Sequence, residues 1–170
     1  AVRATATERL GFPSDAYVVA LVGGTGVGKS SLLNALAGAT ISPATVRRPT
    51  TSRPIAWLPA DHRPVFAPLL AWLDVEPEDV HVAAPAEVPL AILDLPDLDS
   101  TSTDHRQRVE AILPRVDAVI WVTDPEKYAD AILHDDFLRT WLPRLGRQVI
   151  VLNKADRLSA ADGVRVQRDL

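Results

Sequence analysis

Gly23, Gly28, Lys29 and Ser30 have the types and the spacing of a phosphate-binding loop. They stand in the segment GGTGVGKSS, which matches the pattern G-x-x-x-x-G-K-[ST]. A chain of phosphates needs several N–H donors at close range, and glycines let the backbone turn tightly enough to supply them. Lys29 would neutralise phosphate charge, and the Ser30 hydroxyl would ligate Mg²⁺. We prefer this interpretation to the alternative of a glycine-rich turn between a strand and a helix.

Two further polar segments follow apolar runs later in the chain. Asp94 ends the run AILD, at the place in chain order where P-loop enzymes use an acidic residue in the Mg²⁺ shell. On its own this aspartate would be an ordinary turn residue. Asn153, Lys154 and Asp156 follow the apolar run VIVL. Two of the chain's three lysines, Lys29 and Lys154, therefore lie in these segments, whereas Lys127 does not.

Apolar runs that alternate with helical patterns must position these segments. We expect strands at 17–22, 55–58, 80–83, 90–93, 118–122 and 148–152, and helices at 29–37, 62–73, 103–113 and 125–142, with a last helix opened by Ser159. This order predicts an α/β fold, with a mostly parallel sheet covered by helices on both faces. Ligands of such sheets lie beyond the carboxyl ends of the strands, which places the chemistry just after Val22, Leu93 and Leu152.

Length, composition and charge exclude several classes. The 170 residues fit one domain, and the lack of cysteine excludes disulfides, thiolate metal sites and a cysteine nucleophile. A net charge of −4 gives no overall basic surface for nucleic acid. No apolar run approaches the roughly 20 residues of a membrane-spanning helix. We expect a cytoplasmic domain, peripheral to a membrane if the full-length protein so directs, and a piece of something longer.

The three polar segments together resemble the G domain of the bacterial Era-, septin- and dynamin-like group of P-loop GTPases. The resemblance rests on N-K-x-D at 153–156, GKSSLLNALAG at 28–38, TTSRP at 50–54 and DLP at 94–96, and it covers the chain from about Tyr17. It implies the three-layer P-loop NTPase fold, GTP or GDP with Mg²⁺, and recognition of guanine by Asp156. The last strand and helix of that fold would lie beyond Leu170.

The resemblance assigns residues to roles. Lys29 and Thr51 would be catalytic, with Thr50 as the alternative to Thr51, and Arg48 has the spacing of the cis arginine of heterotrimeric G-protein α subunits, or is a solvated arginine. Ser30, Thr51 and Asp94 would hold the metal. Nucleotide binding would fall to Gly23, Thr25, Gly26, Val27, Gly28, Lys29, Ser30, Ser31, Asn153, Lys154 and Asp156.

Departures from the family bear on turnover. Asp97 replaces the glycine of D-x-x-G, so a second carboxylate stands where a backbone N–H normally contacts the γ-phosphate. Leu98 replaces the glutamine that orients water in Ras-like proteins, and an alkyl group cannot polarise water. Gly26 stands where some potassium-activated, dimerising relatives have Asn or Asp. Residues 54–90, with Trp57, Trp72 and seven prolines, read as an insertion that packs on the sheet edge or offers an interaction surface.

We therefore expect a regulatory GTPase that turns over slowly alone and faster after dimerisation or partner binding. The alternative is a nucleotide-dependent interaction module that does not hydrolyse, and a P-loop kinase or ATPase is disfavoured by N-K-x-D. Guanine nucleotide is the predicted ligand. A second copy or a partner protein, and membrane or ribosome and RNA association, are left undecided by these residues.

Overall fold

The computed structural model describes residues 8–9, 11–13, 15–42, 53–83, 85–99, 103–130 and 132–169. Within these residues six strands form one sheet in the order β3-β2-β4-β1-β5-β6. Their bounds are β1 Tyr17–Val22, β2 Ile55–Pro59, β3 Val80–Ala83, β4 Leu90–Asp94, β5 Ala118–Thr123 and β6 Gln148–Leu152. Neighbouring strands are parallel except for β2 and β4, which are antiparallel. The predicted strands and the mostly parallel sheet are confirmed.

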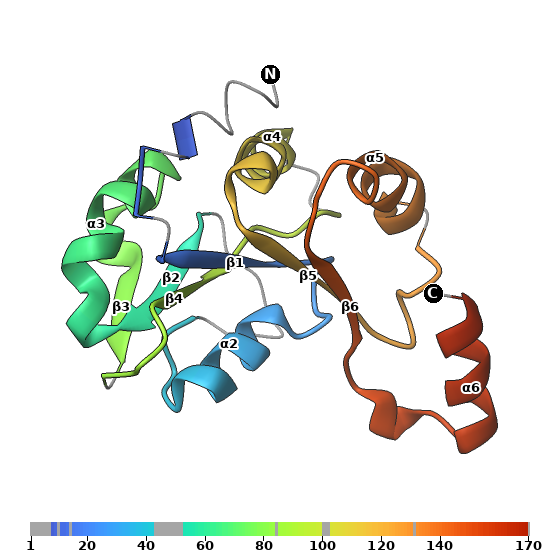
Figure 1. Cartoon of the computed structure of the whole chain (residues 1–170). Helices are drawn as coiled ribbons and strands as arrows, with labels where there is room; N and C mark the ends of the chain where they lie inside the picture. Colours follow the sequence, from blue (N-terminus) through green and yellow to red (C-terminus); the bar gives the residue numbers. More distant parts are fainter. Residues whose placement is uncertain are drawn as a thin grey trace.

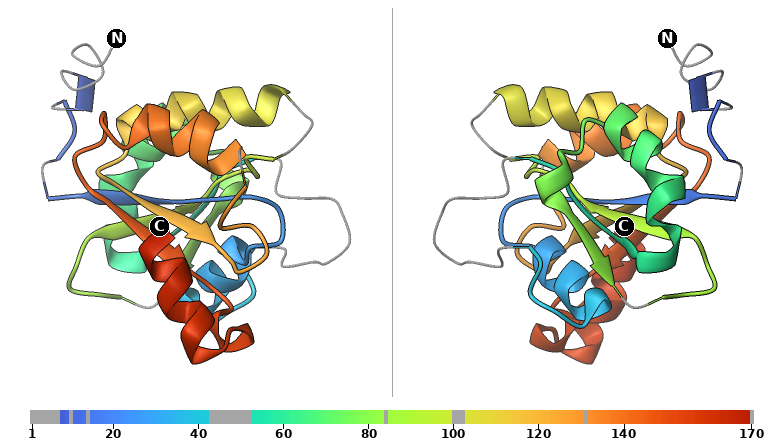
Figure 2. Two further views of the ribbon diagram at one scale, coloured as in Figure 1. Left: turned by 90° about the vertical axis from the view of Figure 1, so that its right-hand side faces the viewer. Right: turned by 90° about the vertical axis from the view of Figure 1, so that its left-hand side faces the viewer.

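Helices cover both faces of this sheet (Figures 1 and 2). The α3, α4 and α5 helices lie on one face, and α2 and α6 lie on the other. Their bounds are α2 Lys29–Ala37, α3 Arg63–Trp72, α4 Thr103–Ile112, α5 Arg139–Trp141 and α6 Ala160–Asp169. In the part of the chain that is described, no helix has both the length and the apolar character needed to cross a bilayer.

The alternation of side chains along β1 divides the core into two layers. Val18 and Ala20 belong to the larger apolar cluster, which α3 and α4 complete with residues such as Phe66 and Val109. Leu21 points the other way and packs in a smaller cluster with Leu33 of α2. A strand buried on both faces needs apolar residues at every position, which explains the continuous run YVVALV.

One predicted helix is present in the structure, and another is replaced by turns and shorter helical segments. The helix at 62–73 is confirmed as α3 despite Pro64 and Pro68, because its apolar residues share one buried face. The prediction of one continuous helix at 125–142 was wrong: residues 125–129 form turns, and the π-helical segment η4 (Ile132–Leu138) and α5 follow. Asp124 causes the turn, because its Oδ1 accepts the N–H groups of Glu126 and Lys127 at 3.1 and 3.0 Å.

Residues 54–90 contain β2, α3 and β3, and β3 is the edge strand of the sheet. Between α3 and β3 lies the short 3₁₀ turn η2 (Pro77–Asp79), and η1 (Ala60–His62) precedes α3. The segment thus packs as a strand–helix–strand unit at the sheet edge. Its interpretation as an insertion stays a prediction.

The carboxyl ends of four strands converge on one region. Leu98 donates its backbone N–H to the Gly23 carbonyl at 3.2 Å, so the segment after β4 lies beside the segment after β1. Asn153 donates its backbone N–H to Thr123 at 2.8 Å, which joins the segments after β6 and β5. The segments after Val22, Leu93 and Leu152 therefore form one site, as the strand order predicts.

Candidate functional site

The loop at residues 23–28, which we call the P-loop, connects β1 to α2 and requires glycine at two close approaches. A Cβ on Gly23 would lie 2.1 Å from the Val122 carbonyl oxygen. Gly28 has a φ of 103°, and a Cβ there would lie 2.2 Å from Asn153 Nδ2. Neither position accepts a side chain without rearrangement, so the backbone is pressed between β5 and the turn after β6.

Lys29 opens α2 and turns its ammonium group back into this loop. Its Nζ donates to the carbonyl oxygens of Gly23 and Gly24 at 2.9 and 3.1 Å, and to Asp97 Oδ1 at 2.5 Å. Both side chains of this ion pair are almost fully buried, 4% exposed for Lys29 and 9% for Asp97. The Asp97 carboxylate therefore faces Lys29, the lysine predicted to bind phosphate, and is not turned away from it.

Ser30 and Asp94 form the side of the site that suits a magnesium ion. Ser30 Oγ donates to Asp94 Oδ2 at 2.6 Å, and Ser42 Oγ donates to the same oxygen at 2.7 Å. Among the described residues Asp94 Oδ1 has no hydrogen-bond partner although it is buried. Burial raises the pKa of Asp94, and the opposing effects of Lys29, Ser30 and Ser42 do not cancel it.

A divalent cation would give Asp94 Oδ1 the partner that it lacks and would compensate the negative charge of this buried carboxylate. A hydroxyl and a carboxylate oxygen are ligands that Mg²⁺ prefers, with water and phosphate completing its shell. No group of three or more His, Asp or Glu side chains that could hold a metal by itself occurs in the described residues. The residues fit a magnesium ion held jointly by protein and phosphates.

The turn after β6, residues 153–156, contacts the P-loop directly. Asn153 Nδ2 donates to the Val27 carbonyl at 2.8 Å, and Lys154 Nζ donates to the Gly26 carbonyl at 2.6 Å. Lys154 also pairs with Asp124 Oδ2 at 2.6 Å, and its own backbone is left-handed with a φ of 55°. Asp156 lies exposed in the following 3₁₀ turn, η5 (Ala155–Arg157).

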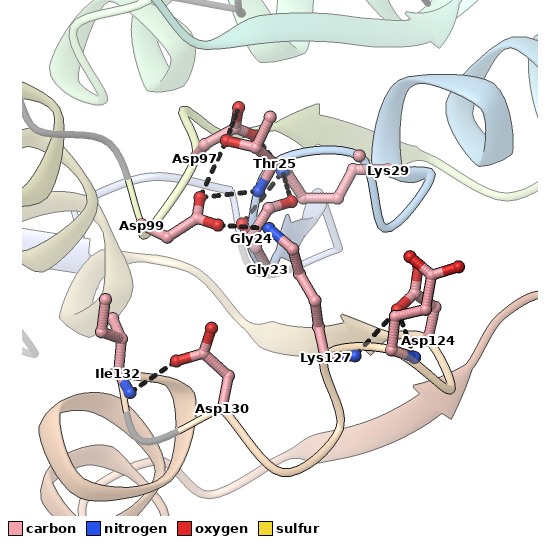
Figure 3. Close-up of polar contacts among 12 residues, drawn as sticks. Gly23, Gly24, Thr25, Lys29, Asp97, Asp99, Asp124, Lys127, Asp130 and Ile132 are labelled. Carbon is pink, nitrogen blue, oxygen red and sulfur yellow. Dashed lines mark hydrogen bonds and ion pairs between the residues drawn. The ribbon is translucent and has the colours of Figure 1, made fainter. Parts of the chain in front are cut away.

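Asp99 and Lys127, which the motifs did not identify, lie beside the P-loop (Figure 3). Asp99 Oδ1 accepts the backbone N–H of Thr25 at 2.7 Å and the Thr25 hydroxyl at 2.8 Å. Its other oxygen accepts Lys127 Nζ at 2.5 Å. Thr25 Oγ1 also donates to Asp97 Oδ2 at 2.9 Å. Burial opposes the charge of Asp99, but the hydrogen bonds from Lys127 and Thr25 outweigh burial and lower the pKa of Asp99.

The structure brings together most of the predicted site residues. The P-loop, Lys29, Ser30, Asp94, Asn153 and Lys154 are joined by the contacts above, and Ser31 is exposed in the first turn of α2. Thr51, its alternative Thr50, and Arg48 lie outside the described residues. Sequence reasoning missed Asp99, Asp124 and Lys127. The scarcity of lysine was the signal for Lys127, because all three lysines of the chain stand at this site.

Comparison with known proteins agrees with this arrangement. The family model described as 50S ribosome-binding GTPase matches residues 18–154, which is most of the chain and includes the P-loop, Asp94 and Asn153. A search of curated proteins finds no match at a significant level.

Solved structures with the same fold include three kinds of GTPase. Era from Aquifex aeolicus bound to GDP·AlF4⁻ superposes with a TM-score of 0.65 and 20% identity over 91% of this chain and 46% of that chain. A bacterial dynamin from an oligomerised pair gives 0.62 and 17%, over 99% and 32%. A structure of the chloroplast translocon components atToc33 and psToc159, for whose GTPase activity dimerisation is important, gives a TM-score of 0.60 and 18% identity, over 99% of this chain and 66% of that chain. The chain thus spans about half the length of Era. Identities this low show the fold alone.

The contact between the P-loop and the turn at 153–156 makes a prediction for Gly28. Gly28→Ala should destabilise the protein more than Gly38→Ala, because Gly38 has a left-handed φ of 65° and nothing within 4 Å of the added Cβ, whereas the φ of Gly28 is 103°. The left-handed backbone costs about 1–2 kcal/mol at position 38 and at least as much at position 28, where φ lies further from the range that alanine adopts. The hydrogen bond of Asn153 to Val27, worth about 1 kcal/mol, is lost only in the first.

Unfolding free energies in urea measure this difference. Adding Asn153→Ala to Gly28→Ala removes the atom that the new Cβ meets, so the double variant should lose less stability than the sum of the two single variants. Strict additivity, or equal losses at Gly28 and Gly38, would contradict the described packing.

Proposed function

This chain belongs to the 50S ribosome-binding GTPase family, and we propose that it binds GTP and GDP with Mg²⁺ and hydrolyses GTP. The observation that carries the proposal is the direct contact of the phosphate-binding and guanine-recognition segments, through Asn153 and Lys154. One nucleotide can therefore reach both, with its phosphates in the P-loop and its base at the turn after β6.

Selection of guanine would fall to Asp156. An exposed carboxylate at this turn can accept two hydrogen bonds from the ring N–H and the amino group of guanine. Adenine presents the wrong pattern of donors and acceptors to the same carboxylate, which would be left without partners. The stem of Lys154, fixed at both Gly26 and Asp124, lies ready to pack over the plane of the base.

Lys29, Ser30 and Asp94 would act on the phosphates. Lys29 is placed to neutralise the β- and γ-phosphates once it exchanges Asp97 for a phosphate oxygen. Ser30 and Asp94 would hold Mg²⁺, directly or through water. The bound ion would neutralise charge that develops on the phosphate oxygens. Hydrolysis would then be in-line attack of water on the γ-phosphorus.

We propose slow turnover by a single copy of the domain. Leu98 occupies the position of the water-orienting glutamine, and it is an alkyl side chain only 4% exposed, so it offers water neither a donor nor an acceptor. A second copy or a partner protein would have to supply that group. Dimerisation matters for the activity of the translocon GTPases of similar fold, and we propose a second copy of this chain as the first candidate.

Binding of GTP, XTP and ATP to wild type and to Asp156→Asn tests the assignment of the base. Wild type should prefer GTP to ATP. Asp156→Asn exchanges one acceptor for a donor, so its affinity for GTP should fall by about a hundredfold, as expected for two charge-assisted hydrogen bonds. Xanthine carries a carbonyl in place of the amino group of guanine, so the variant should gain affinity for XTP.

Arg157→Gln is the matched control, because Arg157 is the next residue and forms an exposed pair with Glu126. Its affinity for GTP should stay within about twofold of wild type. Preference of the wild type for ATP over GTP would overturn the guanine assignment.

Phosphate release as a function of protein concentration separates hydrolysis from the alternative, a module that binds nucleotide without turnover. Turnover per molecule should be low in dilute protein and should rise with concentration, because a second copy completes the site. Absence of phosphate release at every concentration, with GTP bound, would favour the non-hydrolysing module. A rate per molecule that is constant across concentrations would contradict stimulation by dimerisation.

A further inference from the structure

The carboxylate of Asp99 is bound in the way that an oxygen-rich anion would be. One oxygen accepts the P-loop N–H of Thr25 and the Thr25 hydroxyl, and the other accepts the ammonium of Lys127. Backbone N–H groups of a P-loop and a lysine are the donors that proteins use for phosphate oxygens. The Asp99 carboxylate therefore marks a position where an anion is held between the P-loop and Lys127 (Figure 3).

This position lies at the terminal-phosphate end of the site. Asp97, two residues earlier, pairs with Lys29 Nζ, the group that would reach the β- and γ-phosphates. The Thr25 hydroxyl oxygen lies 2.9 Å from Asp97 Oδ2 and 2.8 Å from Asp99 Oδ1, so the two carboxylates lie side by side and share its single hydrogen. A third phosphate added to a bound diphosphate would meet the position of Asp99, whereas the diphosphate by itself would not.

Lys127 has a hydrogen-bonded backbone and a side chain that can reach a phosphate. Its backbone N–H donates to the carboxylate of Asp124, and the same carboxylate pairs with Lys154 in the turn after β6. The Lys127 side chain is about one third exposed, and it lines one small pocket with Gly24 and Leu98. The ammonium group can therefore change partners without moving its backbone, at little cost in lost burial.

We propose that Lys127 is a second phosphate-binding lysine, which holds the terminal phosphate of a bound GTP at the position that the Asp99 carboxylate takes in this structure. Binding of the triphosphate then displaces Asp99 from this position. Binding of the diphosphate does not, so Asp99 has no effect on the affinity for the diphosphate. The inference rests on the proposed function, and it adds a residue that discriminates GTP from GDP. Like charges at one position exclude each other, so phosphate and Asp99 compete for Thr25 and Lys127.

Calorimetric titration with GDP and with a non-hydrolysable GTP analogue, both with Mg²⁺, tests the proposal on four proteins: wild type, Asp99→Asn, Lys127→Met and the double variant. Asp99→Asn keeps the shape of the side chain but removes its charge, so it should bind the triphosphate about tenfold more tightly. Adding Lys127→Met to that variant should weaken triphosphate binding by about tenfold or more. Binding of GDP should change by no more than about twofold in any of them.

The double variant distinguishes a lysine that binds phosphate from one that only holds Asp99. If Lys127 only held Asp99, the double variant would bind the triphosphate as tightly as Asp99→Asn, and that result would overturn the proposal. Arg139→Met is the control for loss of a long cation, since Arg139 forms an exposed pair with Asp135 in the same stretch of chain. Thermal unfolding of each variant confirms that it is folded.

The two proposals fail differently. Wild type that binds neither guanine nucleotide would overturn the proposed function and this inference with it. Wild type that binds both, with a double variant that binds the triphosphate as tightly as Asp99→Asn, would overturn the role of Lys127 alone.

Discussion

The close approach of the P-loop to the turn after β6 is the constraint on which the site depends. Asn153 reaches the Val27 carbonyl only because Gly28 has no side chain, and a Cβ at Gly28 would meet the amide nitrogen at 2.2 Å. Parallel pairing of β1 with β5 and of β5 with β6 brings the two segments to the same edge of the sheet. Side-chain hydrogen bonds from the turn after β6 to the P-loop backbone thus couple the fold to the candidate site.

Every lysine at this edge is paired with an aspartate. Three lysines, Lys29, Lys127 and Lys154, each pair with an aspartate at 2.5 to 2.6 Å, and the partners Asp97, Asp99 and Asp124 come from the segments after β4 and β5. Breaking a buried ion pair leaves an uncompensated charge, which is costly unless a new partner replaces the old one. Under the proposed function a nucleotide would bring its own negative charge to the lysines, so its binding would be linked to a rearrangement of Asp97 and Asp99.

The sheet, the P-loop and the proximity of the P-loop to the turn after β6 could be predicted from the sequence. Continuous apolar runs such as YVVALV specify buried parallel strands, and the motifs follow those strands directly. The prediction of a helix at 125–142 was wrong because it rested on the periodicity of apolar residues. That periodicity does not include the effect of Asp124, whose carboxylate accepts two backbone N–H groups. Asp99 and Lys127 belong to no motif and are 28 residues apart, so only the folded chain brings them together.

Hydrogen exchange of the backbone amides, with and without ligand, tests most directly whether the P-loop and the 153–156 turn bind one molecule. GDP should slow exchange in both segments at once, at the same ligand concentration. Pyrophosphate, which has no base, should protect the P-loop and leave residues 153–156 unchanged. Protection of the P-loop by GDP with no effect at 153–156, or equal protection of both segments by pyrophosphate, would contradict the account.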